Sequence, residues 1–193
     1  MTNSMMNSDN PRAFSFIGGT SGTWTVASQR TVSGDPIGEA SSVEMSPGLL
    51  ADVPAGALWM LRGVATNDRY TTSAEKAALL KRQKPVGRAS SSRAALILLR
   101  KSPAWWALAQ DERRDILEEH SHHIAIGMRY LPAVARRLLH CRDFGTAEPF
   151  DFIGFLDYAP GDDDAFDEML GQLRATREWS FMEREIDIRL EKA

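Results

Sequence analysis

The sequence predicts an α+β protein, in which a ferredoxin-like antiparallel β-sheet is covered by helices and has extra N-terminal strands. Three observations support this fold class. Short runs rich in β-branched and aromatic residues recur along the chain, such as RAALILLR (93–100) and FDFIGFLDY (150–158). Amphipathic helical runs lie between them. From residue 57 onward the order is β-α-β, a helical insert and again β-α-β, which is typical of a split βαβ arrangement.

The N-terminal part of the chain contains short strands and a long connection. AFSFIGG (13–19) and TWTVASQRTV (23–32) are β-rich runs separated by Gly, Thr and Ser, which favours a hairpin. Residues 34–55 contain Gly, Pro and Ser, and we expect a long connection there. Residues 57–70 are apolar at first and then polar, which predicts a strand. These first strands are expected to extend the sheet.

Helical signals dominate the middle of the chain. Residues 71–83 have a Thr or Ser cap with Glu75 behind it, which predicts a helix. The short apolar run at 93–100 predicts a buried strand. The segment 104–127 has an apolar face and is predicted to be helical. Pro132 interrupts the pattern, and AVARRLLHC is expected to resume the helix.

The C-terminal part repeats the strand-helix-strand order. FDFIGFLDY is expected to be a strand. The segment DDDAFDEMLGQLRATRE begins with acidic residues and then places apolar side chains at i, i+3, i+4 and i+7, which predicts an amphipathic helix. Those side chains are Phe166, Met169, Leu170 and Leu173. Near the C-terminus, apolar and charged residues alternate over 186–190, which predicts a half-buried strand.

Size and composition restrict the class of protein. The chain has 193 residues, 43% of them hydrophobic, which is enough for one globular domain with a full core. We expect residues 1–12 to form a flexible tail and residues 13–193 to form this single domain. The net charge is −3 and the sequence contains no long basic block, so nucleic acid and anionic membranes are not expected partners. A single cysteine excludes an internal disulfide, and neither a signal peptide nor an apolar run of about 20 residues is evident. We expect a cytoplasmic protein.

All four histidines and the only cysteine lie within residues 118–141. They are His120, His122, His123, His140 and Cys141. Three hypotheses compete for this cluster: a zinc site, a haem ligand, or a solvated helix face. Zinc is disfavoured because structural sites require paired ligands, and only the spacing of His120 and His123 offers one pair. His120 and His122 fit solvated positions, whereas the apolar sequence IAIG after His123 suits a side chain that faces a pocket.

Other enzyme motifs are missing from the sequence. It contains no GxSxG, no HExxH, no P-loop and no GxGxxG. Cys141 has no obvious basic partner beyond its neighbours. A serine or cysteine hydrolase and a nucleotide-binding enzyme are therefore disfavoured.

Four features spread over residues 93–190 form a distinctive pattern. They are a tryptophan pair, a histidine followed by a tyrosine at +7 and an arginine at +13, an FDF strand, and a glutamate after LRAT. The residues are Trp105, Trp106, His123, Tyr130, Arg136 and Glu178. This pattern resembles the chlorite dismutase family of haem b proteins, most closely its short, dimeric branch. His120 remains an alternative ligand, although only His123 has the tyrosine and the arginine at the family's offsets.

The resemblance implies a haem b enzyme that converts chlorite to chloride and dioxygen. It implies that His123 is the iron ligand and that Glu178, at the start of the last strand, fixes the second imidazole nitrogen. On the other side, Arg136 would hold the hypochlorite leaving anion and Gln83 would orient Arg136. Trp105 and Ile97 would form apolar walls of the haem site. The implied partners are a small anionic substrate and a second copy of the chain in a homodimer.

The spacing of His123 and Arg136 places a condition on the fold. In an unbroken helix, thirteen residues advance about 20 Å, which is too far for two groups on either side of one flat ring. The chain must therefore bend between them, and Pro132 is the expected place.

Two other functions are considered beside chlorite decomposition: decarboxylation, which the sequence disfavours, and haem binding without that reaction, which stays open. Coproheme decarboxylases of the same superfamily have a tyrosine before the tryptophan and a glutamine in place of the arginine. Residues 84–104 contain no tyrosine and Arg136 is present, which disfavours decarboxylation. A haem-binding protein of the same fold with a sensing, carrier or weak peroxidase role is the second alternative, and Arg136 favours chlorite decomposition over it.

Overall fold

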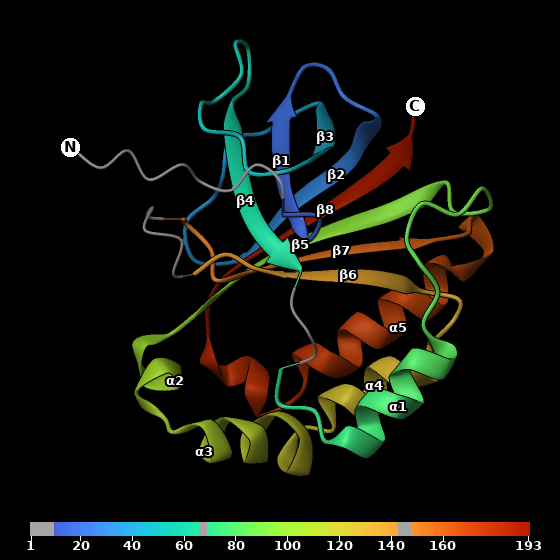
Figure 1. Ribbon diagram of the computed structural model, residues 1–193. Coiled ribbons are helices and arrows are strands. Elements are labelled where there is room, and N and C mark those ends of the chain that lie inside the picture. Colours follow the sequence, from blue (N-terminus) through green and yellow to red (C-terminus); the bar gives the residue numbers. More distant parts are fainter. Residues whose placement is uncertain (1–9, 66–68, 143–147) are drawn as a thin grey trace.

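A computed structural model describes residues 10–65, 69–142 and 148–193, and these form a closed eight-stranded barrel with helices on one side (Figure 1). Around the barrel the strands follow the order β1-β3-β2-β8-β5-β7-β6-β4. Their bounds are β1 Ala13–Gly19, β2 Trp24–Ser33, β3 Ser42–Pro47, β4 Trp59–Ala65, β5 Arg93–Lys101, β6 Ala135–His140, β7 Phe152–Tyr158 and β8 Met182–Lys192. All pairings between them are antiparallel.

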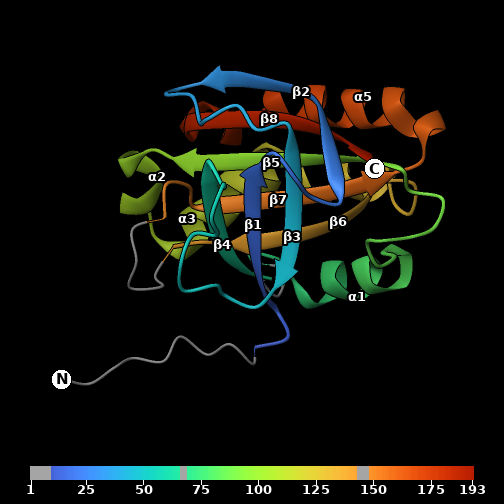
Figure 2. The same ribbon diagram turned by 90° about the horizontal axis from the view of Figure 1, so that it is seen from above.

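The predicted fold class is wrong, because the sheet is closed rather than an open ferredoxin-like sheet covered by helices. Strand β1 pairs with β3 on one side and with β4 on the other. Strand β2 pairs with β8, and β4 pairs with β6 through Val64↔His140 and Ala65↔Leu139. Closure gives hydrogen-bonding partners to the edge strands of an open sheet. Figure 2 shows how β1, β3 and β4 cross over the other strands.

Strand β3 lies inside the predicted long connection at 34–55. Its sequence, SVEMSP, alternates over only two apolar residues, Val43 and Met45, within a segment that contains Gly, Pro and Ser, which explains why a strand was not expected there. Within this segment Val43 is 1% exposed and belongs to the barrel core. The strand is stabilised chiefly by its six residue pairs with β1, which the local sequence does not reveal.

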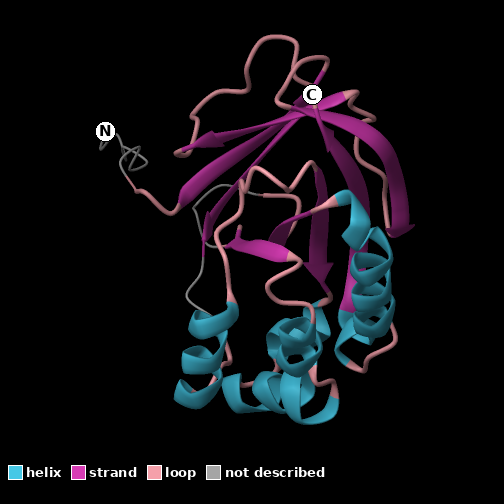
Figure 3. Cartoon of the chain, turned by 90° about the vertical axis from the view of Figure 1, so that its right-hand side faces the viewer, coloured by secondary structure: helices cyan, strands magenta, loops and turns pink. Residues whose placement is uncertain are grey.

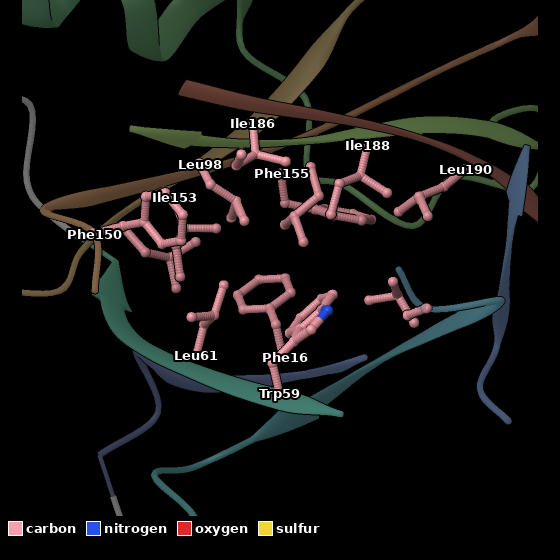
Figure 4. Packing of buried hydrophobic residues seen from close by; sticks show 14 of the residues in the cluster. Phe16, Trp59, Leu61, Leu98, Phe150, Ile153, Phe155, Ile186, Ile188 and Leu190 are labelled. Atoms are coloured by element: carbon pink, nitrogen blue, oxygen red, sulfur yellow. The ribbon is translucent and has the colours of Figure 1, made fainter. Parts of the chain in front are cut away.

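The barrel interior is the main hydrophobic core. Alternate residues of β5 face this interior, and Leu96 and Leu98 pack there with Phe16 of β1 and Phe155 of β7 (Figure 4). Residues Ala95, Ile97 and Leu99 of the same strand contact the helices on the outer face. Both faces of β5 are therefore covered, which accounts for its continuous apolar sequence.

The helices gather on one side of the strands (Figure 3). They pack against the outer face of β5, β6 and β7. Helix α1 (Ser73–Arg82) begins at the predicted cap: the N–H of Glu75 donates to Thr72 Oγ1 at 3.2 Å, and the N–H of Thr72 donates to Glu75 Oε2 at 2.7 Å. Helix α5 (Asp163–Arg174) buries the four predicted apolar side chains. Both helix predictions are confirmed.

The helical insert at 104–127 is broken into short pieces. They are α2 (Pro103–Ala107), α3 (Gln110–Arg114), the π-helical turn η1 (Asp115–His120) and α4 (His123–Arg129). The backbone of His122 is left-handed, with φ of 53°, so α4 starts in a new direction at His123. The zinc hypothesis required His120 and His123 to lie on the same helix, and they do not.

Strand β6 replaces the helix predicted for AVARRLLHC. Arginine and leucine favour helices locally, but Ala135–His140 pairs along its whole length with β7. The chain turns between α4 and β6, so the predicted bend between His123 and Arg136 is confirmed.

Two further details concern the termini of the predicted domain. Residues 1–9 of the expected tail lie outside the described residues, and the N–H of Ala13 donates to the carbonyl of Asn10 at 2.9 Å. In β8, Ile186, Asp187 and Ile188 are all buried, so this strand is covered on both faces rather than half-buried. None of the helices in the described residues combines the length and the apolar character needed to cross a bilayer.

Candidate active site

A cavity of about 550 Å³ lies where α1, α2 and α4 face β5, β6 and β7. Five of the predicted site residues line it: Gln83, Trp105, His123, Arg136 and Glu178. The predicted wall residue Ile97 does not. It is 3% exposed and lines a smaller neighbouring cavity of about 70 Å³, which His123 and Arg136 also border. The structure thus brings together residues that are as much as 95 positions apart in the sequence.

The main cavity is strongly cationic. Its basic lining residues are Arg69, Lys76, Lys84, Lys101, Arg136 and Arg137. Among the described lining residues, Glu178 is the one acid, and it is paired with Lys101. Such a cavity attracts small anions and anionic substituents of a larger ligand.

His123 and Glu178 form the central contact of the site. Nδ1 of His123 lies 2.6 Å from Oε2 of Glu178, and Nζ of Lys101 donates to Oε1 of the same carboxylate at 2.7 Å. Glu178 and Lys101 are 3% and 4% exposed. Because one imidazole nitrogen faces the carboxylate, the second nitrogen is available to a ligand in the cavity.

The Glu178 carboxylate is ionised despite its burial. Burial alone would raise its pKa, but the charges of His123 and Lys101 and their hydrogen bonds outweigh that effect and lower the pKa of Glu178 to about 2. For Lys101 burial dominates and lowers the pKa of the ammonium, although Glu178 opposes the shift. A buried anion beside the imidazole makes the ring a more basic ligand.

Local structure fixes the backbone of Glu178. It lies in the 3₁₀ turn η3 (Glu178–Phe181) that precedes β8, not at the start of that strand as predicted. Its N–H donates to Oγ of Ser121 at 2.9 Å, and Ser121 is 2% exposed. The segment before α4 and the turn before β8 are therefore joined next to His123.

Arg136 extends from β6 toward α4. One of its guanidinium nitrogens, Nη1, lies close above the Cα of Gly127, where any Cβ would meet it. Gly127 follows His123 by one helical turn, so both residues are on the same side of α4. Gln83, the C-cap of α1, donates through Nε2 to the main-chain carbonyl of Arg136 at 3.4 Å, not to the guanidinium. The predicted contact between Gln83 and Arg136 is thus present, but through a different group.

Two of the side chains that line the cavity contain a buried donor with no hydrogen-bonding partner within the described part of the chain. These donors are the hydroxyl of Tyr70 and the indole N–H of Trp105. The two rings meet edge to face with centroids 6.3 Å apart. Leaving a buried donor without an acceptor is unfavourable, so a ligand that brought an acceptor within reach of either group would stabilise this wall of the cavity. A haem, which has an apolar ring and two carboxylates, fits such a cavity.

Sequence reasoning missed Lys101 and Tyr70. Lys101 ends the apolar β5 run four residues before Trp105, and a lysine at that position in a buried strand is a weak signal for a buried ion pair. Tyr70 was expected at the end of a polar strand, but its backbone has a φ of 63° in the connection to α1. Neither position has a local sequence motif.

The remaining histidines and the cysteine do not join the site. The side chain of His120 is 46% exposed, and its Nδ1 lies 3.6 Å from Oδ2 of Asp115. His140 and Cys141 are buried, and burial raises the pKa of the Cys141 thiol. In the three described ranges of the chain, no group of three or more His, Cys, Asp and Glu side chains is arranged to hold a metal ion.

Comparison with known proteins identifies relatives among solved structures. No protein-family model matches the chain, and no curated protein matches it. The dimeric chlorite dismutase from Nitrobacter winogradskyi is 49% identical to the chain, with a TM-score of 0.85. The match covers 93% of this chain and 99% of that one.

More distant structures come from Candidatus Nitrospira defluvii. Its chlorite dismutase in complex with imidazole is 22% identical, with a TM-score of 0.56, over 70% of this chain and 56% of that one. A mutant chlorite dismutase in complex with cyanide is 13% identical, with a TM-score of 0.62, over 100% and 96%. These two similarities show the fold alone. The Nitrobacter protein, in contrast, is nearly half identical over almost its entire length, and the chain therefore belongs to the chlorite dismutase family.

Proposed function

We propose that this protein is a haem b enzyme that decomposes chlorite to chloride and dioxygen. The contact between His123 and Glu178 on the wall of a cationic cavity carries the proposal, together with membership of the family. The reaction is balanced as ClO₂⁻ giving Cl⁻ and O₂, without an external oxidant or reductant. It would require a residue that holds the haem, the role proposed for His123, and a cation that holds the substrate anion, the role proposed for Arg136.

His123 would hold the haem iron through Nε2. The carboxylate of Glu178 accepts the Nδ1 hydrogen, which leaves the lone pair on Nε2 directed away from Glu178. When bound, the haem iron would supply the centre that accepts an oxygen atom from chlorite. Lys101 keeps Glu178 ionised, so the imidazole retains an anionic partner.

Arg136 would bind the substrate anion and then the hypochlorite that remains after oxygen transfer. A guanidinium stays charged at every working pH and offers a planar fork of donors to a small oxyanion. It retains hypochlorite so that the second oxygen atom can form the O–O bond. Gln83 would act on the backbone, because it donates to the Arg136 carbonyl and holds the end of α1 against β6.

Tyr70 and Trp105 would anchor the haem carboxylates. Both side chains line the cavity and contain a buried polar atom without a partner among the described residues, and the lining adds cations, including Lys76 and Lys84. Charge-assisted hydrogen bonds from these groups contribute more than neutral ones. This arrangement would orient the ring with its carboxylates toward the Tyr70 end of the cavity.

The oligomeric state and the location belong to the same proposal. The Nitrobacter relative is described as dimeric, and we propose a homodimer. Because the described strands form a closed barrel, the subunits would meet through side chains and not by pairing of sheet edges. A single domain over residues 13–193 and a cytoplasmic location remain part of this proposal.

Oxygen evolution tests the function directly. The protein is loaded with haem b and mixed with chlorite in an oxygen electrode, and chloride is measured at the end. One O₂ and one chloride per chlorite consumed are expected. A protein that binds haem and leaves chlorite intact would instead be a sensing or carrier protein of the same fold.

A further inference from the structure

A second buried carboxylate, Glu118, lies next to His123 but contacts its helix rather than its ring. Glu118 is 9% exposed and belongs to the π-helical turn η1. Its Oε2 accepts the N–H of Ile124 at 2.6 Å, and its Oε1 accepts the N–H of Ala125 at 3.3 Å. The carboxylate thus takes two of the free N–H groups at the start of α4, where His123 is the first residue.

The cap is needed because the chain changes direction here. His122 occupies the N-cap position with left-handed backbone angles, and its side chain makes no capping hydrogen bond. The carbonyl of Glu118 also accepts the N–H of His122 at 2.9 Å. Both the main chain and the side chain of Glu118 therefore hold the first turn of α4.

The same segment is tied to the carboxylate that receives the His123 ring. Ser121 lies between Glu118 and His123 and accepts the N–H of Glu178 at 2.9 Å. The backbone of His123 is thus held from one side by Glu118, and its ring is held from the other by Glu178. A change in the direction of α4 would move Nδ1 away from Glu178.

We propose that Glu118 is a positioning residue for the iron ligand: by capping α4 it sets the distance between His123 Nδ1 and Glu178, and hence the basicity of the imidazole. The proposal rests on the proposed function, in which His123 binds haem iron. Glu118 does not touch the haem or the substrate in this account. It acts through the orientation of His123.

The neighbouring residue Glu119 gives a matched control. Its side chain is 60% exposed and pairs with Arg114 at 3.1 Å. Glu118→Gln and Glu119→Gln each remove one carboxylate from the same turn, and both keep the side-chain length. Only Glu118→Gln puts an NH₂ group where a second acceptor is required, so one N–H of α4 loses its partner.

The iron–imidazole stretching band of the ferrous holoprotein, measured by resonance Raman spectroscopy, is the readout. Glu118→Gln should move it to lower frequency, because the imidazole loses part of its hydrogen bond to Glu178. Haem dissociation, followed by transfer to an apo-globin, should become about ten-fold faster. Glu119→Gln should match the unmodified protein in both measurements. A residue that only stabilises the fold would lower the melting temperature and leave the band in place.

A double variant shows whether Glu118 acts through Glu178. In the Glu178→Gln background the hydrogen bond to the carboxylate is already absent, so adding Glu118→Gln should shift the band little further. Equal shifts in both backgrounds would overturn the proposal. Glu118→Asp, whose shorter side chain withdraws the carboxylate from Ile124, provides a second test if Glu118→Gln does not fold, and a band unchanged from the unmodified protein would overturn it too.

Failure of this inference can be told apart from failure of the proposed function. If the unmodified protein binds no haem, the proposed function is wrong. If His123→Ala keeps the iron–imidazole band, the ligand assignment is wrong and Glu118 has no ligand to position. If the unmodified protein behaves as expected and Glu118→Gln equals Glu119→Gln, only the inference is wrong.

Discussion

His123 Nδ1 and Glu178 Oε2 lie 2.6 Å apart, although 55 positions separate the two residues in the chain. The contact joins the first residue of α4 to the turn before β8, two elements that pack on the same side of the barrel. It is a short hydrogen bond between an imidazole and a buried anion, so it controls the electron density of the ring.

Replacing Glu178 with glutamine should raise the iron reduction potential of the haem-loaded protein. The imidazole loses its hydrogen bond to an anion, and such a bond contributes about 1.5–3 kcal/mol of free energy. This free energy corresponds to a rise in the reduction potential of roughly 60–130 mV for one electron. Spectroelectrochemistry measures it. Glu183→Gln, which removes a half-exposed acid paired with Arg100, is the control and should leave the potential unchanged.

Replacing His123 with alanine should abolish or greatly weaken haem binding. The cavity keeps its shape, but no other described histidine borders it. Titration of the apo-protein with haem, followed at the Soret band, gives the affinity, and added imidazole should restore part of the band. His120→Ala should bind haem normally, because that side chain is half exposed. The opposite pattern, loss with His120→Ala and retention with His123→Ala, would exchange the two assignments.

Arg136→Ala should keep the haem and slow oxygen evolution by about one to two decades. A charge-assisted hydrogen bond to the leaving anion is worth roughly 1.5–3 kcal/mol. Hypochlorite should escape, bleach the haem and react with a chlorine-trapping dye. Arg136→Lys should be intermediate, since it keeps the charge and loses the planar fork. Arg100→Ala, half exposed on β5, is the control. Unchanged rate and durability in Arg136→Ala would contradict a catalytic role.

Tyr70→Phe should have opposite effects on the apo-protein and on haem binding. Without haem the hydroxyl is buried and has no partner among the described residues, so its removal should leave the free energy of unfolding unchanged or raise it by about 1 kcal/mol. With haem the hydroxyl would meet a carboxylate, so affinity should fall about ten-fold. Urea unfolding and haem titration measure the two effects. A loss of stability in the apo-protein would mean that the hydroxyl serves the fold.

Lowering the pH should reduce the free energy of unfolding, because Glu75 at the start of α1 loses its ion pair when it is protonated. Its hydrogen bonds from Arg114, which outweigh the opposing effect of burial, lower the pKa of Glu75 to about 2. A pKa depressed on folding gives stability above pH 4.5 that is lost as the pH falls toward 2. After allowance for partial exposure, this contribution is about 2 kcal/mol. Urea unfolding between pH 7 and pH 3 should show a smaller loss for Glu75→Gln than for the unmodified protein, and equal losses would contradict the prediction.

The sequence predicted the elements that depend on local signals. The capping box of α1 and the apolar spacing of α5 are properties of a few neighbouring residues, and both helices are present. Strand β6 was predicted as a helix, because its pairing with β7 overrides local propensity. Barrel closure was missed for a similar reason. The residue pairs that join β1 to β3 on one side and to β4 on the other cannot be predicted from the local sequence of any one strand.

Site residues could be predicted from the sequence only where they belong to the pattern that resembles the family. The resemblance named His123, Arg136 and Glu178, which the structure brings to one cavity. Lys101 and Tyr70 were missed because a buried ion pair and an unpaired buried donor become visible only when their surroundings are known. Ile97 lines the smaller cavity that His123 and Arg136 also border, because alternation along β5 predicts which face of the sheet it occupies but not its position along the strand relative to the main cavity.

The pairing of β2 with β8 has a consequence for how the protein is made. Trp24 pairs with Lys192, so β2, which leaves the ribosome early, must wait until β8 has been synthesised before its hydrogen-bond ladder with β8 can form. Until then β2 offers unpaired backbone groups to other nascent chains. The Glu178 turn also emerges late, after α1, α2, α4 and the strands β5 to β7 that border the cavity. A cofactor captured before this turn is synthesised would find His123 without its carboxylate partner.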